Sequence, residues 1–280
     1  MGMRVSSLVI CSIVLTAAVA WGKDTADPAA LMARSDAQYY YPTQVGLHDL
    51  AVDLVIDELQ NSPVGKLATI SYYYVNEDRQ RFAVAGLDDQ YAKFRDDLLG
   101  LVDPLSNYLV PRASTNAFHG LDLRVDRVSR QLAGRPDTTY FLLVGTASDA
   151  EAMVKEYRVL LDAAGLACQV ESVLKDGSRL MARIDNTRVG EKWCIHRVTT
   201  RMLVNNAPQW RIEAVEYAQI DGFTMPATIT IRQRNALNQP VKGAQDWTIR
   251  LTNYRINQGV AAATIPPPPA PPAPPADAPT

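Results

Sequence analysis

Two stretches near the end of the chain decide the fold: MPATITIRQR at residues 225–234 and WTIRLTNYRI at residues 247–256. In the first, an alanine and two isoleucines alternate with two threonines and an arginine. In the second, Trp247, Ile249 and Leu251 alternate with two threonines and one arginine. A period of two is typical of a strand that has one buried face and one solvated face. The sequence therefore predicts a sheet with an apolar side that something must cover.

Comparable segments extend over most of the chain. We predict strands at 50–56, 67–75, 81–85, 121–128, 138–146, 156–161, 167–174, 180–188, 193–204, 210–220, 225–234 and 247–256. Glycine-containing turns, such as those at Gly165, Gly177 and Gly222, separate several of them and favour antiparallel hairpins. The sequence therefore predicts a mainly β (α+β) protein with about 11 to 12 strands, more than an open twisted sheet carries without curling.

The helical patterns are short and lie early in the chain. Asp27 and Pro28 are typical of a helix start, and Leu31, Met32 and Ser35 share one face of the helix that follows. A second amphipathic helix is predicted from Leu87 to Leu101, followed after Pro104 by one more turn over 105–110. An apolar concave face of this size must be filled by these helices, by a ligand or by another protein. We expect helices to cover the concave face of an incomplete antiparallel β-barrel, a half-barrel.

The start of the chain is typical of an export signal. One arginine precedes an apolar run from residue 5 to residue 20, which ends in small residues suited to signal-peptidase cleavage. We therefore interpret residues 1–20 as a signal peptide and 21–27 as a flexible segment, in a protein exported to the periplasm of a bacterial cell envelope. Without the leader the net charge is about −3, so we expect no nucleic-acid partner.

The remaining chain is interpreted as one domain and a tail. No change in composition between residues 45 and 257 marks a linker, so 28–257 is predicted to form a single domain. Residues 258–280 are rich in proline and are predicted to be a disordered tail. A solvated spacer is one interpretation of this tail, and a docking segment for an aromatic-lined partner is the other.

The sequence indicates no catalytic residue, no metal site and no cofactor. His48, His119 and His196 have no neighbour at zinc-ligand spacing. His196 lies two residues from Cys194, on the same face of a predicted strand, but without an evident orienting group. A disulfide between Cys168 and Cys194 is one alternative for the mature cysteines, and two small buried thiols are the other.

The order of these patterns, together with a few local phrases, resembles the LolA/LolB lipoprotein-carrier superfamily, which includes LppX-type lipid carriers and the amino-terminal domain of RseB. The phrases are YYYVNEDRQRF at 72–82, LLDAAG at 160–165, DGFTMP at 221–226 and TNYR at 252–255. The resemblance covers about residues 28 to 257. It implies an incomplete barrel whose helices close a hydrophobic cavity for acyl chains.

A periplasmic carrier or chaperone for lipid or lipoprotein acyl chains is the function that this resemblance implies, with a membrane-protein donor or acceptor as a further partner. The alternatives are an RseB-like envelope-stress sensor that binds a membrane protein, and a structural protein whose core is filled by its own side chains. For a carrier, we expect the cavity to be lined by apolar residues of the predicted strands and helix: Leu50, Val52, Leu54, Ile56, Tyr72, Tyr74, Val84, Leu98, Ile229 and Leu251.

Two tyrosine triplets, at 39–41 and 72–74, suit the wall or rim of an apolar cavity, because a tyrosine ring is apolar and its hydroxyl is polar. Ordinary strand composition is the alternative explanation, since aromatic residues are frequent in sheets. Tyr72 and Tyr74 share one strand face and Tyr73 takes the other, so at most one set faces the interior.

Overall fold

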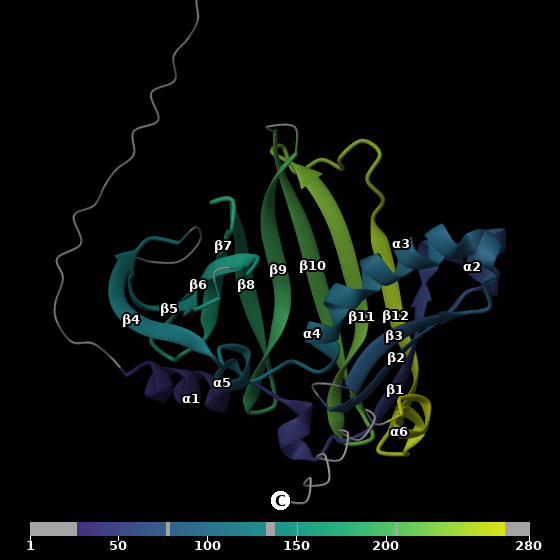
Figure 1. Cartoon of the computed structure of the whole chain (residues 1–280), viewed down its shortest axis with the longest axis horizontal. Helices are drawn as coiled ribbons and strands as arrows, with labels where there is room; N and C mark the ends of the chain where they lie inside the picture. Colours follow the sequence, from purple (N-terminus) through teal and green to yellow (C-terminus); the bar gives the residue numbers. More distant parts are fainter. Residues whose placement is uncertain (1–26, 77–78, 133–137, 150, 205–206, 267–280) are drawn as a thin grey trace, which may run out of the picture.

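A computed structural model describes residues 27–76, 79–132, 138–149, 151–204 and 207–266. Twelve strands form one antiparallel sheet in the order β3-β2-β1-β12-β11-β10-β9-β8-β7-β6-β5-β4. The sheet is strongly curved but does not close into a barrel, so β3 and β4 are its two edges (Figure 1). The predicted mainly β fold and open half-barrel are confirmed. The predicted signal peptide at 1–20 and residues 21–26 lie outside the described residues.

The strands agree closely with the alternating segments of the sequence. They are β1 (Leu50–Ile56), β2 (Thr69–Asn76), β3 (Arg79–Ala85), β4 (Leu121–Arg130), β5 (Thr138–Ala147), β6 (Val154–Leu161), β7 (Ala167–Leu174), β8 (Arg179–Val189), β9 (Lys192–Val204), β10 (Ala207–Ile220), β11 (Phe223–Asn235) and β12 (Trp247–Ile256). The alternation in the last strand also has its expected result. Ile249 is fully buried, while Arg250 is exposed and forms an ion pair with Asp57.

Sequential hairpins build most of the sheet, but one long-range pairing joins its two parts. Strand β12 pairs with β1, with Leu54 opposite Leu251 and Ile56 opposite Ile249. Strand β1 also pairs with β2 on its other side. The first and last strands of the chain are therefore neighbours near the middle of one half of the sheet.

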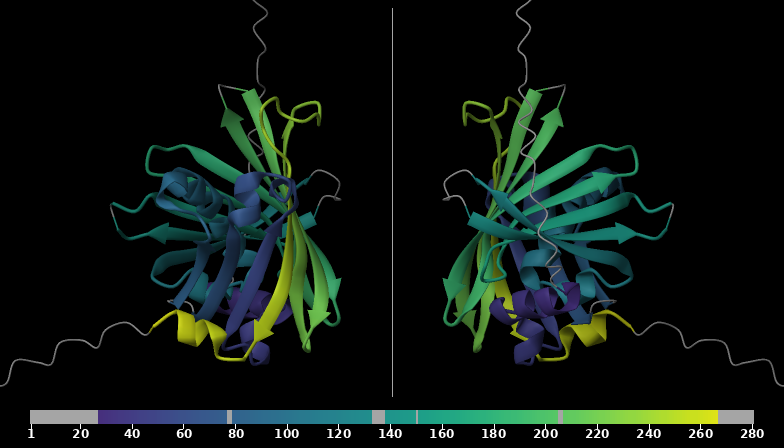
Figure 2. Two further views of the ribbon diagram at one scale, coloured as in Figure 1. Left: turned by 90° about the vertical axis from the view of Figure 1, so that its right-hand side faces the viewer. Right: turned by 90° about the vertical axis from the view of Figure 1, so that its left-hand side faces the viewer.

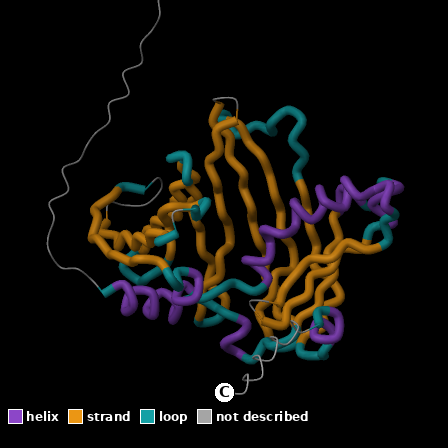
Figure 3. The backbone as a smooth tube through the Cα atoms, in the orientation of Figure 1, coloured by secondary structure: helices purple, strands orange, loops and turns teal. Residues whose placement is uncertain are grey.

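The helices are short, and most lie against the concave side of the sheet (Figure 3). They are α1 (Pro28–Gln38), α2 (Pro63–Leu67), α3 (Ala92–Val102), α4 (Ser106–Leu109), α5 (Ser114–Ala117) and α6 (Val260–Thr264), with 3-10 turns η1 (Pro42–Val45), η2 (Asp57–Leu59), η3 (Asp89–Tyr91) and η4 (Asp103–Leu105). The Asp27 side chain accepts hydrogen bonds from the first backbone amides of α1, as its position before Pro28 predicted. Helix α3 begins later than expected, because residues 89–91 form a separate 3-10 turn.

The main core lies between β1, β2, β10–β12 and the helices α3 and α4. The side chains of Leu98, Val102, Leu105 and Leu109, from α3, the turn η4 and α4, belong to a cluster that includes Ile229. All five side chains are almost completely buried. The protein's own side chains therefore fill the space between these strands and the helices.

The chain remains ordered beyond the predicted domain boundary at residue 257. Helix α6 packs on one end of β1 and β2 (Figure 2). The buried Asp49 carboxylate accepts hydrogen bonds from the backbone amides of Ala261 and Ala262, at 3.3 and 2.7 Å. Residues 258–266 therefore belong to the folded domain and not to a disordered tail. The rest of the predicted tail, 267–280, lies outside the described residues.

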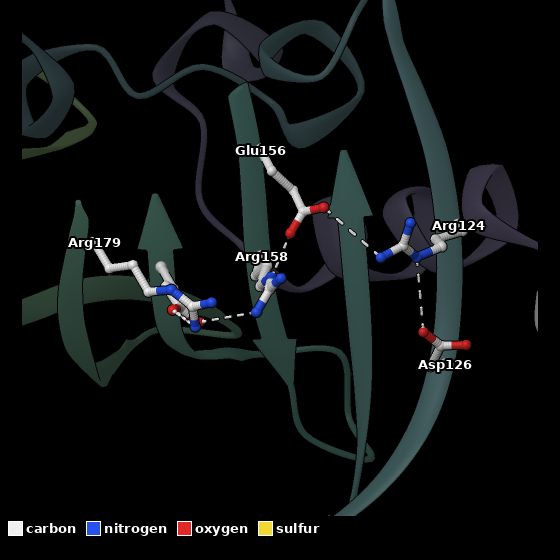
Figure 4. Close-up of polar contacts among 6 residues, drawn as sticks. Arg124, Asp126, Glu156, Arg158 and Arg179 are labelled. Carbon is white, nitrogen blue, oxygen red and sulfur yellow. Dashed lines mark hydrogen bonds and ion pairs between the residues drawn. The ribbon is translucent and has the colours of Figure 1, made fainter. Parts of the chain in front are cut away.

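The opposite, outer side of strands β4–β8 carries a ladder of alternating charges (Figure 4). Arg124 contacts Asp126 and Glu156, and Arg158 bridges Glu156 to Glu171, which also pairs with Arg179. The arginines are 30 to 60% exposed, so each pair contributes only about 0 to 1 kcal/mol. The charges mark this side of the sheet as the solvated side.

Candidate functional site

A cavity of about 450 Å³ lies between the concave face of strands β5–β11 and the segments that hold α1, α4 and α5. Its lining is mostly aliphatic and aromatic. The residues that line it are Met32, Ser35, Tyr39, Tyr40, Tyr41, Pro42, Asn107, Tyr108, Pro111, Arg112, Ser114, Ala117, Phe118, Leu143, Val159, Leu161, Ala167, Val170, Cys194, Ile195, Tyr217 and Thr224. The volume is within the range of about 300 to 1,000 Å³ that is usual for small-molecule sites.

The floor of the cavity is the aliphatic face of β5 and β6. Leu143 lies opposite Val159 in the sheet register, and Leu161 follows two residues later on the same face. All three are buried, and they pack against Leu31 and Met32 of α1. The two-residue alternation of these strands brings their aliphatic side chains to the concave side.

Tyr39, Tyr40 and Tyr41 form an aromatic wall directly after α1. A short parallel bridge between Tyr39 and Trp193 fixes this segment on β9, and the Tyr40 amide donates to the Trp193 carbonyl at 2.9 Å. The Tyr39 hydroxyl accepts from the Ala167 amide at 2.9 Å, and the Tyr40 hydroxyl accepts from the Thr224 amide at 3.0 Å. The hydroxyl groups of Tyr39 and Tyr40 are therefore hydrogen-bonded to backbone amides of the sheet.

Two further tyrosines line the cavity from α4 and β10. The Tyr108 hydroxyl donates to Glu213 at 2.6 Å, and the Tyr217 hydroxyl donates to the Ile195 carbonyl at 2.9 Å. Burial raises the pKa of Tyr108 and of Tyr217 above the ordinary value for a phenol, and the nearby Glu213 carboxylate raises that of Tyr108 further. The hydroxyls of these tyrosines therefore stay protonated and bonded to the protein, so the rings offer the cavity apolar surface.

A buried carboxylate holds the helical side of the cavity together. Asp36, at 8% exposure, accepts a hydrogen bond from the Tyr41 hydroxyl at 2.9 Å. Its oxygens also accept from the amide and hydroxyl of both Ser114 and Thr115, at the start of α5. All these donors are neutral groups. Asp36 thus joins α1, the tyrosine segment and α5 around one point.

Gly165 allows α1 to lie close to the β6–β7 turn. It has a φ of +93°, and an added Cβ atom would lie 3.3 Å from the Cα atom of Ser35. A side chain here would therefore be strained and would also press on the helix that carries Met32 and Ser35. The turn chemistry expected for this glycine is confirmed, and its contact with α1 is an additional role.

The two cysteines of the described part of the chain, Cys168 and Cys194, are separate buried thiols. Cys194 lines the cavity, whereas Cys168 packs with Tyr140 and Leu160 in a different cluster. Leu160 lies between the cavity residues Val159 and Leu161 along β6, so its side chain is on the outer side of the sheet. The disulfide alternative is wrong in this structure, because the sheet separates the two sulfur atoms. Burial raises the pKa of the Cys194 thiol to about 11.

None of the ten residues predicted to line a cavity lines this one. All ten belong to, or pack against, the core beneath α3 and α4: Leu50, Val52, Leu54, Ile56, Tyr72, Tyr74, Val84, Leu98, Ile229 and Leu251. Tyr72 and Tyr74 are buried on one strand face, as predicted; Tyr74 borders a hollow of about 120 Å³, and Tyr72 borders one of about 430 Å³ between β2, β3 and the α3–α4 segment. The structure therefore brings the predicted residues together, but α3 and α4 fill the space between them.

His196, two residues from Cys194 in β9, has a backbone partner in β10. Nδ1 of His196 lies 3.1 Å from the Val215 carbonyl, to which it donates. Within the described ranges, no group of three or more His, Cys, Asp or Glu residues is arranged to hold a metal ion. No helix in the described part of the chain is long and apolar enough to cross a membrane.

Fold and site together define a class of protein: an open antiparallel half-barrel with an apolar cavity between its sheet and its helices. No model of a known protein family matches the chain. No curated protein matches it either. Among solved structures, the chain matches a crystal structure from Vibrio parahaemolyticus described as an outer membrane lipoprotein-sorting protein domain. That match has 9% sequence identity and a TM-score of 0.34, and it covers 84% of this chain and 95% of the other.

Proposed function

We propose that this protein is a carrier or chaperone that binds a lipid, or the acyl chains of a lipoprotein, in its apolar cavity and carries out no chemistry on them. The cavity of about 450 Å³ is the observation on which this function rests. Its floor is aliphatic, and its tyrosine rings have their hydroxyls engaged with the protein. An acyl chain suits such a lining because it needs no hydrogen bonds.

The proposed location is the periplasm, with a membrane-bound donor or acceptor of the guest as the further partner. Support comes from the export signal in residues 1–20, which would place the mature chain in the envelope where lipids and lipoproteins move. A carrier in an aqueous compartment has to shield acyl chains from water. The covered concave side of the sheet offers such a shield.

Chain length provides a first quantitative test. Each methylene group that leaves water contributes about 0.8 kcal/mol, so affinity should rise steadily along a series of single-chain lipids. The rise should stop when the chain fills the cavity. Displacement of a fluorescent acyl probe measures this series. An affinity that does not depend on chain length would contradict binding in the cavity.

A matched pair of variants on β7 locates the binding. Val170 lines the cavity, whereas Val173 is on the opposite face of the same strand, with the charged Glu171. We expect Val170→Trp to abolish or strongly reduce probe binding, because an indole ring occupies the space of the guest. Val173→Trp should bind as the parent does. Equal binding by both variants would refute the cavity as the site.

The principal alternative is a structural protein with a self-filled core. One observation favours it: α3 and α4 already fill the half of the concave face that holds Ile229. Native mass spectrometry of protein purified from its own envelope separates the two functions. A lipid-sized adduct supports the carrier, whereas no adduct together with no uptake of the acyl probe would support the structural protein.

A further inference from the structure

A second, smaller hollow adjoins the apolar cavity and has a different character. It has a volume of about 120 Å³ and is lined by Tyr41, Thr43, Gln44, Tyr74, Gln80, Val110, Pro111, Arg112, Ala113 and Asn116. Tyr41, Pro111 and Arg112 line both spaces. The hollow and the cavity are therefore adjacent chambers that share one wall, the first rich in polar side chains and the second apolar.

Arg112 is the charged side chain of this shared wall. Among the described residues that line either chamber there is no other charged side chain. Four of the other residues in the small chamber carry amide or hydroxyl groups that can hydrogen-bond a polar guest: Thr43, Gln44, Gln80 and Asn116. The small chamber is thus polar, with a positive charge at its junction with the apolar cavity.

This pairing of chambers matches one class of molecule. A single-chain amphiphile has an apolar part that needs no partner and a head group that does. An anionic head, a carboxylate or a phosphate, matches a guanidinium in both charge and hydrogen-bond geometry. We propose that the guest is an anionic amphiphile whose chain lies in the large cavity and whose head group lies in the small chamber beside Arg112. This proposal rests on the carrier function proposed above and specifies its ligand.

The experiment compares guests that share one chain and differ in the head group. Dodecanoate, dodecyl phosphate, dodecanol and dodecyl trimethylammonium each displace the acyl probe from the full chain. We expect the two anions to bind more tightly than the alcohol, and the cation to bind most weakly. In Arg112→Ala the anions should lose about tenfold in affinity, as expected for the loss of one charged hydrogen-bonding group, while the alcohol changes little.

Two control variants separate contact from overall charge. Arg130 is exposed at the end of β4 and lines neither chamber, so Arg130→Ala removes the same charge and should keep the preference for anions. Arg112→Lys keeps the charge and should retain part of the preference. Loss of the preference in Arg130→Ala to the same extent as in Arg112→Ala would overturn the proposal.

The remaining outcomes are also decisive. Equal affinity of the parent for dodecanoate and dodecanol would refute the head-group site but leave the carrier function standing. Failure of every amphiphile to bind would refute both the head-group site and the carrier function. Inorganic phosphate serves as a last competitor, because it tests the small chamber without a chain. If phosphate alone displaces the probe as well as dodecyl phosphate does, the site binds a free anion and the amphiphile proposal is wrong.

Discussion

Replacement of the buried Asp36 should destabilise the protein more than any surface carboxylate can. In Asp36→Ala the Tyr41 hydroxyl, on a side chain that is 6% exposed, loses its acceptor. An unsatisfied buried donor costs about 1 to 3 kcal/mol, and each hydrogen bond to a charged group is worth about 1.5 to 3 kcal/mol. Thr115 is exposed and its groups can turn to water, so we expect a total loss of about 3 to 5 kcal/mol.

Urea unfolding followed by circular dichroism measures this loss as a lower midpoint with an unchanged slope. Asp122→Ala, which removes an exposed carboxylate on β4, is the control and should change stability by less than about 0.5 kcal/mol. Asp36→Asn should have an intermediate effect, because an amide keeps one acceptor oxygen and turns a donor towards the other donors. A loss below about 1 kcal/mol in Asp36→Ala would refute the reasoning that this carboxylate joins α1 to α5.

Three further predictions follow from the ends of the chain, the cysteines and the buried tyrosines. Removal of residues 267–280 should leave stability unchanged in urea unfolding, whereas removal of 258–280 should cost about 1 to 3 kcal/mol, because Asp49 then loses its partners in α6. Equal stability of the two truncations would contradict this. A bound guest should slow alkylation of Cys194, followed by mass spectrometry, but not alkylation of Cys168 on the other side of the sheet. Protection of both thiols would argue against a guest in the cavity. Burial raises the pKa of the cavity tyrosines, and that of Cys194 to about 11, so the unfolded chain releases these protons at lower pH than the folded chain does. The stability that these groups contribute is present below about pH 8.5 and should fall as the pH rises towards 11. Thermal unfolding measures this fall as a lower unfolding temperature. An unfolding temperature that does not change over this pH range would contradict the prediction.

The strands could be predicted from the sequence because their apolar and polar residues alternate over long distances. The pattern at Ile229 and Ile231 specifies a buried face whatever lies on it. It does not specify what covers that face, because the position of α3 and α4 depends on how two helices and their linking turns fit against strands far away in the chain. The predicted lining residues lie outside the cavity of about 450 Å³ for this reason: the residues with the clearest alternation are those that the helices cover.

The aromatic wall was partly visible in the sequence. The triplet at 39–41 could be singled out for its composition, but its contacts with Ala167, Trp193 and Thr224 are separated from it by more than 120 residues. Helix α6 could not be anticipated, because its short alanine-rich sequence lies beside a proline-rich segment and is held by Asp49. Long-range hydrogen bonds of this kind have no local pattern.

The pairing of β1 with β12 has a consequence for the order in which the protein can be completed. Residues 50–56 are among the first of the domain to be synthesised, and residues 247–256 are among the last. Until β12 emerges, β1 has an open edge that can pair with any other extended chain. Contacts this distant in sequence also form slowly, because a long loop must close first. The nascent chain therefore needs protection from aggregation until nearly its full length has been made, and its earliest strand is the one most exposed to that risk.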